Sequence, residues 1–159
     1  MYISKLGTLT NVNDIYSKVF IPSETFFMRG KEIVYSNENI NKEFLSMYDN
    51  ISTGPHLSVS TILEENTVQK CVAQKLKINS IDNEISQIAN TIDNFNKLNS
   101  TNIGYTSLHF ATDYLKSRNE LDKQVELNLS NNRCELAKSC KEVVTKKIVS
   151  LLLEYLLMK

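Results

Sequence analysis

The segment from Ile78 to Phe95 constrains the fold of this chain more than any other stretch. Its large apolar residues recur in steps of 3, 4, 3, 4 and 3, and the residues between them are almost all polar. This spacing is typical of one apolar stripe along an α-helix, as in a coiled-coil seam. The residues of the seam are Ile78, Ile81, Ile85, Ile88, Ile92 and Phe95. A second apolar surface must cover such a seam.

Burial, not helix propensity, has to stabilise the helix that this segment predicts. Residues 78–96 contain five asparagines, and each Asn costs ~0.5 kcal/mol relative to Ala in a helix interior. Burying five isoleucines and one phenylalanine contributes on the order of 10 kcal/mol, gross. The seam therefore predicts a stable helix only where a partner surface exists.

Two interruptions divide the rest of the chain, "STGPH" at 52–56 and "NSTNIGY" at 99–105. Helical periodicity predicts long helices at about 58–98 and 106–158, with a break near 130–132. The chain has only four glycines and two prolines, which favours long helices over a turn-rich sheet. A connection of about seven residues suits two antiparallel helices. The predicted fold class is mainly α, with residues 57–159 forming an antiparallel helical hairpin or coiled-coil-like bundle.

A small N-terminal layer is predicted for residues 1–52. Two β-rich runs, "KVFIP" and "KEIVYS", flank "SETFFMRG" and predict one β-hairpin over 18–36. Gly30 can take a positive φ at its turn. Near-helical apolar spacing then predicts a short helix over 38–49.

The C-terminal run carries a second apolar stripe, which is broad. The residues expected to make its contacts are Ile148, Leu151, Leu152, Tyr155 and Leu156. This stripe can cover the isoleucine seam within one chain, or both can be shared between chains, and the two alternatives stay open. Isoleucine at both core positions of a parallel coiled coil favours trimers or tetramers.

Patterns typical of catalysis, metal binding or cofactor binding are missing from the sequence. Cys134 and Cys140 would point about 120° apart on a helix, which makes a poor pair of metal ligands. His56 and His109 each stand far from another candidate ligand, and there is no Gly-rich phosphate or dinucleotide motif. We therefore predict no catalytic residue, no metal and no cofactor, and a protein that is not an enzyme.

Charge and hydropathy limit the classes of partner that the chain is expected to bind. Net charge is zero and the pI is about 6.7, so the basic footprint of a nucleic-acid-binding protein is missing. No stretch reaches the roughly 18 apolar residues of a membrane-spanning helix. The start has no apolar run of a secretory leader, and three cysteines do not form a disulfide framework. We expect a cytoplasmic protein that binds a protein partner or itself, and neither nucleic acid nor membrane.

One stretch, "YSKVFIPSETFFMRGKEIVYSNE" at 16–38, resembles the first β-hairpin of prefoldin-type subunits. The matching positions are Val19, Pro22, Phe27, Met28, Gly30, Lys31, Val34, Asn37 and Glu38. The resemblance implies a hairpin followed by a long coiled-coil helix, and a chaperone-like role.

The function predicted from the sequence is a non-catalytic assembly subunit that acts through its helical seams. Three alternatives stay open. They are a chaperone-like holdase with the prefoldin-like hairpin, a secreted or virus-encoded helical effector, and a monomeric enzyme or small-ligand bundle. The first alternative requires binding of unfolded chains, and the last requires converging polar groups, for which the sequence has no signal.

Overall fold

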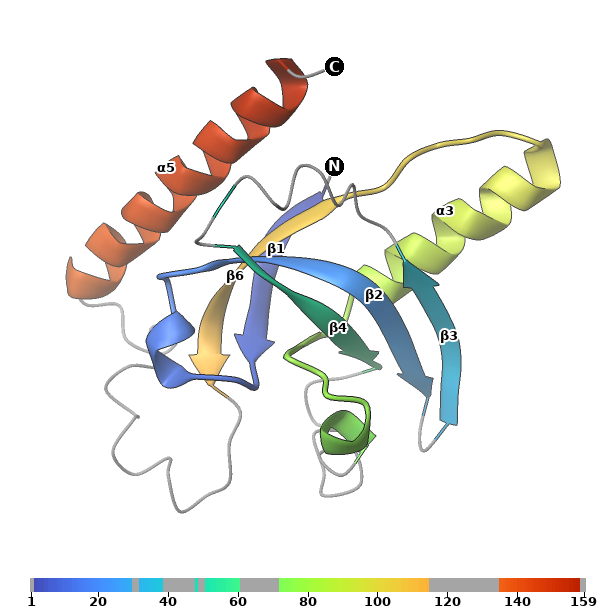
Figure 1. The fold of residues 1–159 in the computed structure, drawn as a ribbon, viewed down its shortest axis with the longest axis horizontal. Coiled ribbons are helices and arrows are strands. Elements are labelled where there is room, and N and C mark those ends of the chain that lie inside the picture. The colour runs from blue at the N-terminus through green and yellow to red at the C-terminus, as the bar shows by residue number, and fades with distance from the viewer. Residues whose placement is uncertain are drawn as a thin grey trace.

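A computed structural model describes residues 2–29, 32–38, 48, 51–60, 72–114 and 135–157 of the protein. The strands gather into one sheet, with a helix on either side (Figure 1). The elements in chain order are β1 (Tyr2–Thr8), the 3-10 helix η1 (Val12–Asp14), β2 (Val19–Arg29), β3 (Glu32–Glu38), β4 (Ile51–Val59), β5 (Ser80–Asp82), α3 (Ile85–Asn99), β6 (Ser107–Tyr114) and α5 (Glu135–Leu157).

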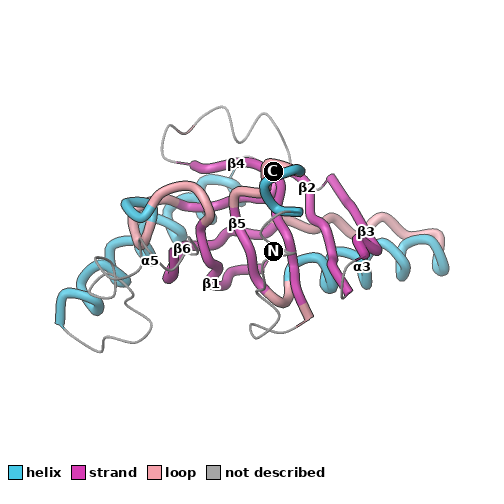
Figure 2. Tube along the Cα trace, turned by 90° about the horizontal axis from the view of Figure 1, so that it is seen from below, coloured by secondary structure: helices cyan, strands magenta, loops and turns pink. Residues whose placement is uncertain are grey.

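The described strands form a mixed sheet in the order β3-β2-β4-β5-β1-β6. Because β2 also pairs with β6, the strands β2, β4, β5, β1 and β6 close into a barrel, and β3 extends from the far half of β2 (Figures 1 and 2). The pairs β1–β6, β2–β4 and β4–β5 are parallel, whereas β1–β5, β2–β3 and β2–β6 are antiparallel. Closure gives each strand of the barrel two neighbours and removes free edges.

Strand β2 joins both halves of the sheet, and a bulge lets it change direction. Its register against β4 shifts between Pro22 and Glu24. Proline has no N–H to donate to a ladder, so a bulge is one of the few places where a paired strand accepts it. Before the bulge, Val19 and Ile21 face one side of the sheet and Phe20 faces the other. All three are buried, so both sides of β2 are covered.

Strand β4 contains the "STGPH" stretch that the sequence suggested was a break. Gly54 has a φ of 155°, and a Cβ atom there would lie 2.3 Å from Asn79 Nδ2. The Asn79 side chain donates to the Thr53 carbonyl at 3.0 Å, and its backbone N–H donates to the Pro55 carbonyl at 3.0 Å. Glycine is required here because the segment leading into β5 lies directly against this strand.

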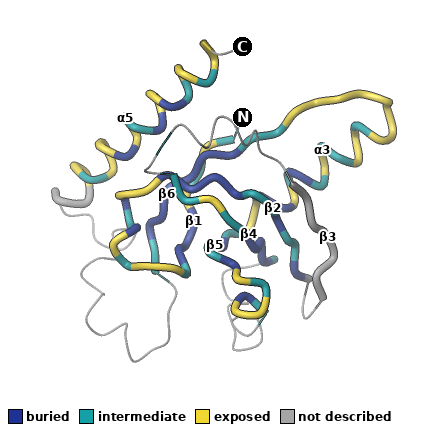
Figure 3. Tube along the Cα trace, viewed as in Figure 1, coloured by how far each residue is buried: buried dark blue, intermediate teal, exposed yellow. Residues whose placement is uncertain are grey.

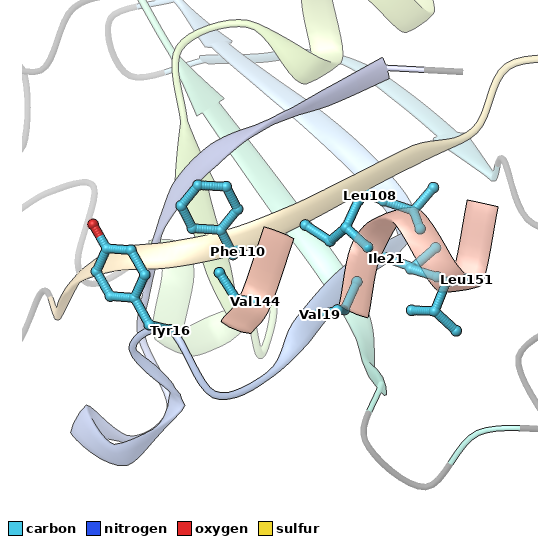
Figure 4. Packing of buried hydrophobic residues seen from close by; sticks show 8 residues of the cluster. Tyr16, Val19, Ile21, Leu108, Phe110, Val144 and Leu151 are labelled. Carbon is cyan, nitrogen blue, oxygen red and sulfur yellow. The ribbon is translucent and has the colours of Figure 1, made fainter. Parts of the chain in front are cut away.

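Helix α5 covers the outside of the barrel over β2 and β6 (Figure 4). Its buried residues recur at helical spacing, and they meet alternating residues of the two strands. We call this cluster the outer apolar layer, and it consists of Tyr16, Val19, Ile21, Leu108, Phe110, Val144, Ile148 and Leu151. Burying one such aliphatic side chain contributes about 1.5–3 kcal/mol.

A second apolar cluster, separate from the outer apolar layer, lies on one face of β4. A helical turn at residues 72–75 and the chain that follows it pack here against β4 and β5. The strand residues involved are Leu57, Val59 and Ile81, each at most 6% exposed. Since neighbours along a strand point to opposite faces, the residues between them must point into the barrel.

The predicted mainly α fold is wrong, and the isoleucine seam shows why. Ile78 precedes β5, Ile81 lies within β5, and α3 begins only at Ile85. Lys77 has a φ of 53°, which ends the preceding helical turn. Isoleucine also favours strands. The same isoleucines can therefore be buried within a sheet as well as along one stripe of a helix. Here β1 and β4 both pair with β5.

The long helix predicted over 106–158 is wrong in the same way. Residues 107–114 form β6, a central strand of the barrel, and the described helix of this region is α5. Leu108 and Phe110 point to the outer apolar layer, while Ala111 joins Leu6 and Phe20 in a separate cluster. Leu108 and Ala111, three residues apart, would share one face of a helix, but here they lie on two faces of a strand.

The remaining N-terminal predictions meet the structure only in part. Strands β2 and β3 form an antiparallel pair that spans Glu24 to Glu38. Gly30 and the break predicted at 130–132 lie outside the described residues. So does the helix predicted over 38–49, except for Glu38 and Tyr48.

Burial differs between the two ends of α3 (Figure 3). Its first turns are buried against the sheet at Ile85, Ser86 and Ala89, whereas Phe95 and Leu98 near its end are 48% and 84% exposed. Among the described residues, no helix combines the length and the apolar character needed to cross a membrane.

Candidate functional site

The inside of the barrel carries polar side chains where β4, β5 and β6 face one another. His56 pairs with Ser80, and Ser58 with Asp82, across β4 and β5. His109 on β6 interacts electrostatically with both His56 and Asp82, although β1 separates β6 from β5. We call this set the polar interior, and it consists of His56, Ser58, Ser80, Asp82 and His109.

A hydrogen-bond network joins most of the polar interior. His56 Nε2 and Asp82 Oδ1 are 2.8 Å apart, and His56 Nδ1 and Ser80 Oγ are 2.9 Å apart. The Ser58 hydroxyl donates to the same Asp82 oxygen at 2.5 Å. Buried carboxylates are tolerated only when they are paired in this way.

Asp82 also receives the first amides of α3. The backbone N–H of Glu84 donates to Asp82 Oδ1 at 3.1 Å, and that of Ile85 donates to Oδ2 at 3.0 Å. Burial alone would raise the pKa of Asp82, but His56, the Ser58 hydroxyl and the Glu84 amide together lower it. A negative charge here is also favoured by the dipole of α3. Asp82 is therefore held as a carboxylate at the start of the helix.

His109 is the unsatisfied member of the polar interior. Its side chain is fully buried, and within the described part of the chain neither ring nitrogen has a partner at good hydrogen-bond geometry, although the backbone of the paired residue Ser4 interacts with the ring. Burial, reinforced by nearby His56, lowers the pKa of His109 to about 3. The ring of Tyr2 lies beside it, with 5.5 Å between ring centroids. Because buried polar atoms are nearly always hydrogen-bonded, these two nitrogens are candidates for contact with water or a ligand.

An exposed carboxylate lies where α3 starts. Glu84 accepts a hydrogen bond from the Tyr2 hydroxyl, and its side chain makes no capping bond to α3. Tyr105 lies nearby, and burial raises the pKa of its phenol. A carboxylate beside two phenol groups is suited to binding hydroxyl groups of a ligand.

A second carboxylate, Asp113, lies where the parallel strands β1 and β6 end together. Asp113 pairs with Gly7, after a bulge that shifts the register by one residue at this point. The Thr112 hydroxyl donates to Asp113 Oδ2 at 2.6 Å. Burial and the nearby Asp113 charge raise the pKa of Tyr16. Ligands commonly bind at the carboxyl ends of parallel strands, and bulges often re-aim a side chain at such sites.

Neighbouring hydroxyl and carboxyl groups follow the end of β1. The Thr10 hydroxyl donates to Asp14 Oδ2 at 2.6 Å and lies 3.0 Å from the Thr8 hydroxyl. Asp14 also pairs with Lys18 at 2.9 Å. This group gives the Asp113 end of the barrel a second set of polar contacts.

The described residues support acid–base chemistry and hydroxyl recognition better than other chemistries. Ser80, His56 and Asp82 are bonded in the order of a nucleophile relay, but Ser80 is only 1% exposed and His56 is fully buried. A nucleophile must reach its substrate, so this relay is suited to positioning. Within the described ranges, no group of three His, Cys, Asp or Glu side chains could hold a metal.

The structure spreads the predicted contact residues over several elements. Of the first set, Ile78, Ile81 and Ile85 are buried, Ile88 and Ile92 are half-buried, and Phe95 is exposed. Of the second, Ile148 and Leu151 are buried beneath α5, Leu152 and Tyr155 are half-buried, and Leu156 is 57% exposed. Contact with a partner molecule through these residues stays a prediction.

Sequence reasoning missed every residue of the polar interior. His56 and His109 are 53 positions apart in the chain, and only the closed sheet brings them together. A usable signal was the alternation of apolar and polar residues at 56–59 and at 80–82. That alternation indicates strands with one polar face.

Comparisons with known proteins identify the fold. No protein-family model matches the chain. A curated relative, Oxidoreductase cns1 of Cordyceps militaris, is 28% identical over 160 aligned residues, which include 96% of this chain and 20% of the relative. The chain thus spans about a fifth of the length of that relative.

Solved structures of nucleosidases share the fold. The 5′-methylthioadenosine nucleosidase of Arabidopsis thaliana matches 93% of this chain with a TM-score of 0.60 and 13% identity, over 59% of its own length. A methylthioadenosine/S-adenosylhomocysteine nucleosidase matches 94% with a TM-score of 0.63 and 15% identity, over 61% of its length. An aspartate-to-asparagine mutant of the Helicobacter pylori enzyme, with 5′-methylthioadenosine in the active site, matches 94% with a TM-score of 0.59 and 11% identity, over 65% of its length. The chain spans about three fifths of the length of the first two structures.

These matches correct the function predicted from the sequence. The predictions of a non-catalytic assembly subunit and of a protein that is not an enzyme are wrong, because the matched structures are nucleosidases and the curated relative is named an oxidoreductase. The holdase and helical-effector alternatives depended on the same all-helical fold and are overturned with it. The assembly function was predicted from continuous helical seams, and the structure has β5, β6 and α3 in their place.

Proposed function

We propose that this chain forms part of an enzyme that hydrolyses the N-glycosidic bond of a purine nucleoside. The observation that carries the proposal is a carboxylate at the joint end of two parallel strands in a nucleosidase-type fold. In this reaction the bond between the sugar carbon and the base nitrogen breaks, and the base departs with the electron pair and gains a proton. Water supplies the hydroxyl group that the sugar carbon receives.

Asp113 is the proposed acid that delivers the proton to the base. Asp82 has a structural role, because it holds His56, Ser58 and two helix amides, whereas Asp113 accepts the hydroxyl of its neighbour Thr112. Asp113 is half-buried at the end of β6, where a base could approach the carboxyl group. The mutant Helicobacter enzyme, with an aspartate replaced and 5′-methylthioadenosine in the active site, supports a catalytic aspartate in this fold.

Glu84, at the Tyr2 end of β1, is a separate proposed contact for sugar hydroxyl groups, because Asp113 lies beside Gly7 near the other end of that strand. Its carboxylate is exposed, is free of capping bonds and is oriented by Tyr2. A carboxylate accepts hydrogen bonds from two neighbouring hydroxyl groups readily, and such charged bonds are about twice as strong as neutral ones.

The name of the curated relative does not conflict with this proposal. The relative is about five times as long as the stretch that it shares with this chain, so its oxidoreductase activity can belong to another part. The sequence of this chain has no Gly-rich dinucleotide motif. We also propose a cytoplasmic location, supported by the three cysteines without a disulfide framework.

The test combines binding and turnover of 5′-methylthioadenosine. Titration calorimetry measures its affinity and that of adenine for the chain, and chromatography measures the adenine released. We expect Asp113→Asn to lower the release rate about 100-fold or more with affinity changed less than about threefold. Asp93→Asn, at a half-buried position on α3 that pairs with Lys97, is the matched control and should release adenine at the parental rate.

Two results would overturn the proposal. One is an Asp113→Asn variant that releases adenine at the parental rate. The other is a parent chain, folded by circular dichroism, that binds neither adenine nor 5′-methylthioadenosine at millimolar concentration.

A further inference from the structure

We propose that His56 is a positioning residue that sets the orientation of Glu84 through Asp82 and the first turn of α3. This inference rests on the proposed function, because Glu84 is the contact for the sugar there. His56 itself is fully buried and does not reach a ligand. It acts through the groups that it holds.

The chain of contacts runs from β4 to the start of α3 without a gap. His56 Nε2 bonds to Asp82 at 2.8 Å, and the side chains are 0% and 4% exposed. Asp82 in turn accepts the amides of Glu84 and Ile85 at 3.1 and 3.0 Å. Turning the Asp82 carboxylate therefore moves the backbone that carries Glu84.

Ser58 adds a parallel connection. Its hydroxyl donates to Asp82 and accepts the backbone N–H of Ser86 at 2.9 Å. Three successive amides of α3, those of Glu84, Ile85 and Ser86, are thus satisfied from β4 and β5. The first amides of a helix have no partner within the helix and usually take a side chain from the N-cap.

This arrangement leaves the N-cap residue available for function. Glu84 is the N-cap of α3, yet its side chain makes no capping bond and accepts from Tyr2 instead. Because Asp82 and Ser58 accept the amides at the start of α3, the carboxylate of Glu84 can face solvent. The device combines a buried, rigid support with an exposed functional group.

The decisive experiment compares His56→Gln with His56→Asn. The glutamine amide extends about as far as Nε2 and can still donate to Asp82. The asparagine amide is one methylene shorter and keeps only the contact near Ser80. Both replacements are polar and uncharged, so they differ mainly in whether they reach Asp82.

The readout is the ratio of affinities for adenosine and 2′-deoxyadenosine, with adenine as a sugar-free reference. We expect His56→Asn to lower this ratio about tenfold, the loss of one hydrogen bond to a charged group, while adenine affinity stays within about twofold. His56→Gln should keep most of the parental ratio.

Amide hydrogen exchange supplies a readout that needs no nucleoside. In the parent, the amides of Glu84 and Ile85 should exchange more slowly than those of Asn102 and Gly104 in the exposed loop, and His56→Asn should accelerate them. Equal ratios and equal exchange in both His56 variants would overturn the positioning role. Parental amides that exchange as fast as the loop would do the same, even if the Asn variant did not fold.

A failure of the proposed function is distinguishable from a failure of this inference. If the parent binds no nucleoside, the function is wrong, and the exchange data still decide whether His56 supports the start of α3. If adenosine binds but both variants discriminate like the parent, only the role of His56 is wrong.

Discussion

The outer apolar layer and the polar interior lie on opposite faces of β6, the strand that they share, and they hold the fold by different means. On β6, Leu108 and Phe110 pack toward α5 (Figure 4). His109 lies between them in sequence and therefore faces the other side of the strand, toward the inside of the barrel. The residues of the outer apolar layer are held together by apolar contacts, which have no preferred direction. The interior is joined by hydrogen bonds at 2.5 to 2.9 Å between particular atoms.

The difference implies unequal tolerance to substitution. Apolar contact depends on volume and shape, so a residue of similar size preserves most of it. A buried hydrogen-bonded carboxylate depends on charge and geometry, so a replacement of the same shape can still leave partners unsatisfied. The interior therefore specifies one arrangement of the strands, and the outer layer supplies most of the stabilising burial.

The largest effect is expected from placing a charge in the outer apolar layer. Ile148 is 2% exposed, so Ile148→Asp should cost more than about 4 kcal/mol or prevent folding, because a buried unpaired carboxylate loses its hydration. Ile148→Leu should cost less than about 1.5 kcal/mol. Urea unfolding followed by circular dichroism measures both. An aspartate variant with the parental midpoint would show that α5 does not stabilise the barrel.

Asp82→Asn tests the interior with almost no change in shape. Removing one partner of a buried pair typically costs about 3–5 kcal/mol, and we expect that loss of unfolding free energy at pH 7. Asp93→Asn removes a pair on α3 in which Asp93 is 30% exposed and Lys97 is 70% exposed, and it should change the free energy by about 0–1 kcal/mol. Equal midpoints for the two variants would mean that the interior tolerates substitution as the outer layer does.

Acid should weaken the interior before it affects the outer layer. The pKa of His109 is about 3 in the folded protein and about 6.5 when unfolded. The unfolded state therefore binds more protons between these pH values, and stability falls as pH drops from 6.5 toward 3, by roughly 3–5 kcal/mol in total. The lowered pKa of Asp82 adds a further loss below pH 3.8. Unfolding of the parent and of His109→Gln across this range should show a smaller loss in the variant, and identical profiles would contradict the assignment.

The smallest effect is expected at the rim of the barrel. Lys18 pairs with Asp14 at 2.9 Å but is 47% exposed, so Lys18→Ala should cost about 0–1 kcal/mol. The measurement is again the urea midpoint at pH 7. A loss as large as that of Asp82→Asn would show that exposed Lys18 supports the Asp14 carboxylate, which is 4% exposed like that of Asp82, as strongly as the polar interior supports Asp82.

Parts of the fold could be predicted from local patterns. The spacing of Val144, Ile148 and Leu151 predicted a helix with one apolar stripe, and these are the residues that α5 buries. The 3–4 spacing of the isoleucine seam is compatible with two structures, because Ile81 can be buried either in a helical stripe or in a short strand. A three-residue strand such as β5 has too few residues for its period to be recognised.

The candidate site could not be predicted because its members meet only through strand pairing. His56, Asp82 and His109 belong to three strands, and the hydrogen bonds of a sheet join residues of any separation in sequence. Asp113 carries no local motif, and its place follows from the bulge and from the parallel pairing with β1.

By itself, the sequence determined which residues are apolar enough to need burial and where a helix such as α5 can present them. Tertiary structure decided which of those residues became strands, which faces closed around polar groups, and which carboxylates lie beside a hydroxyl or a histidine. The physical reason is that a helix satisfies its backbone within itself, whereas each strand depends on neighbours that the closed sheet provides.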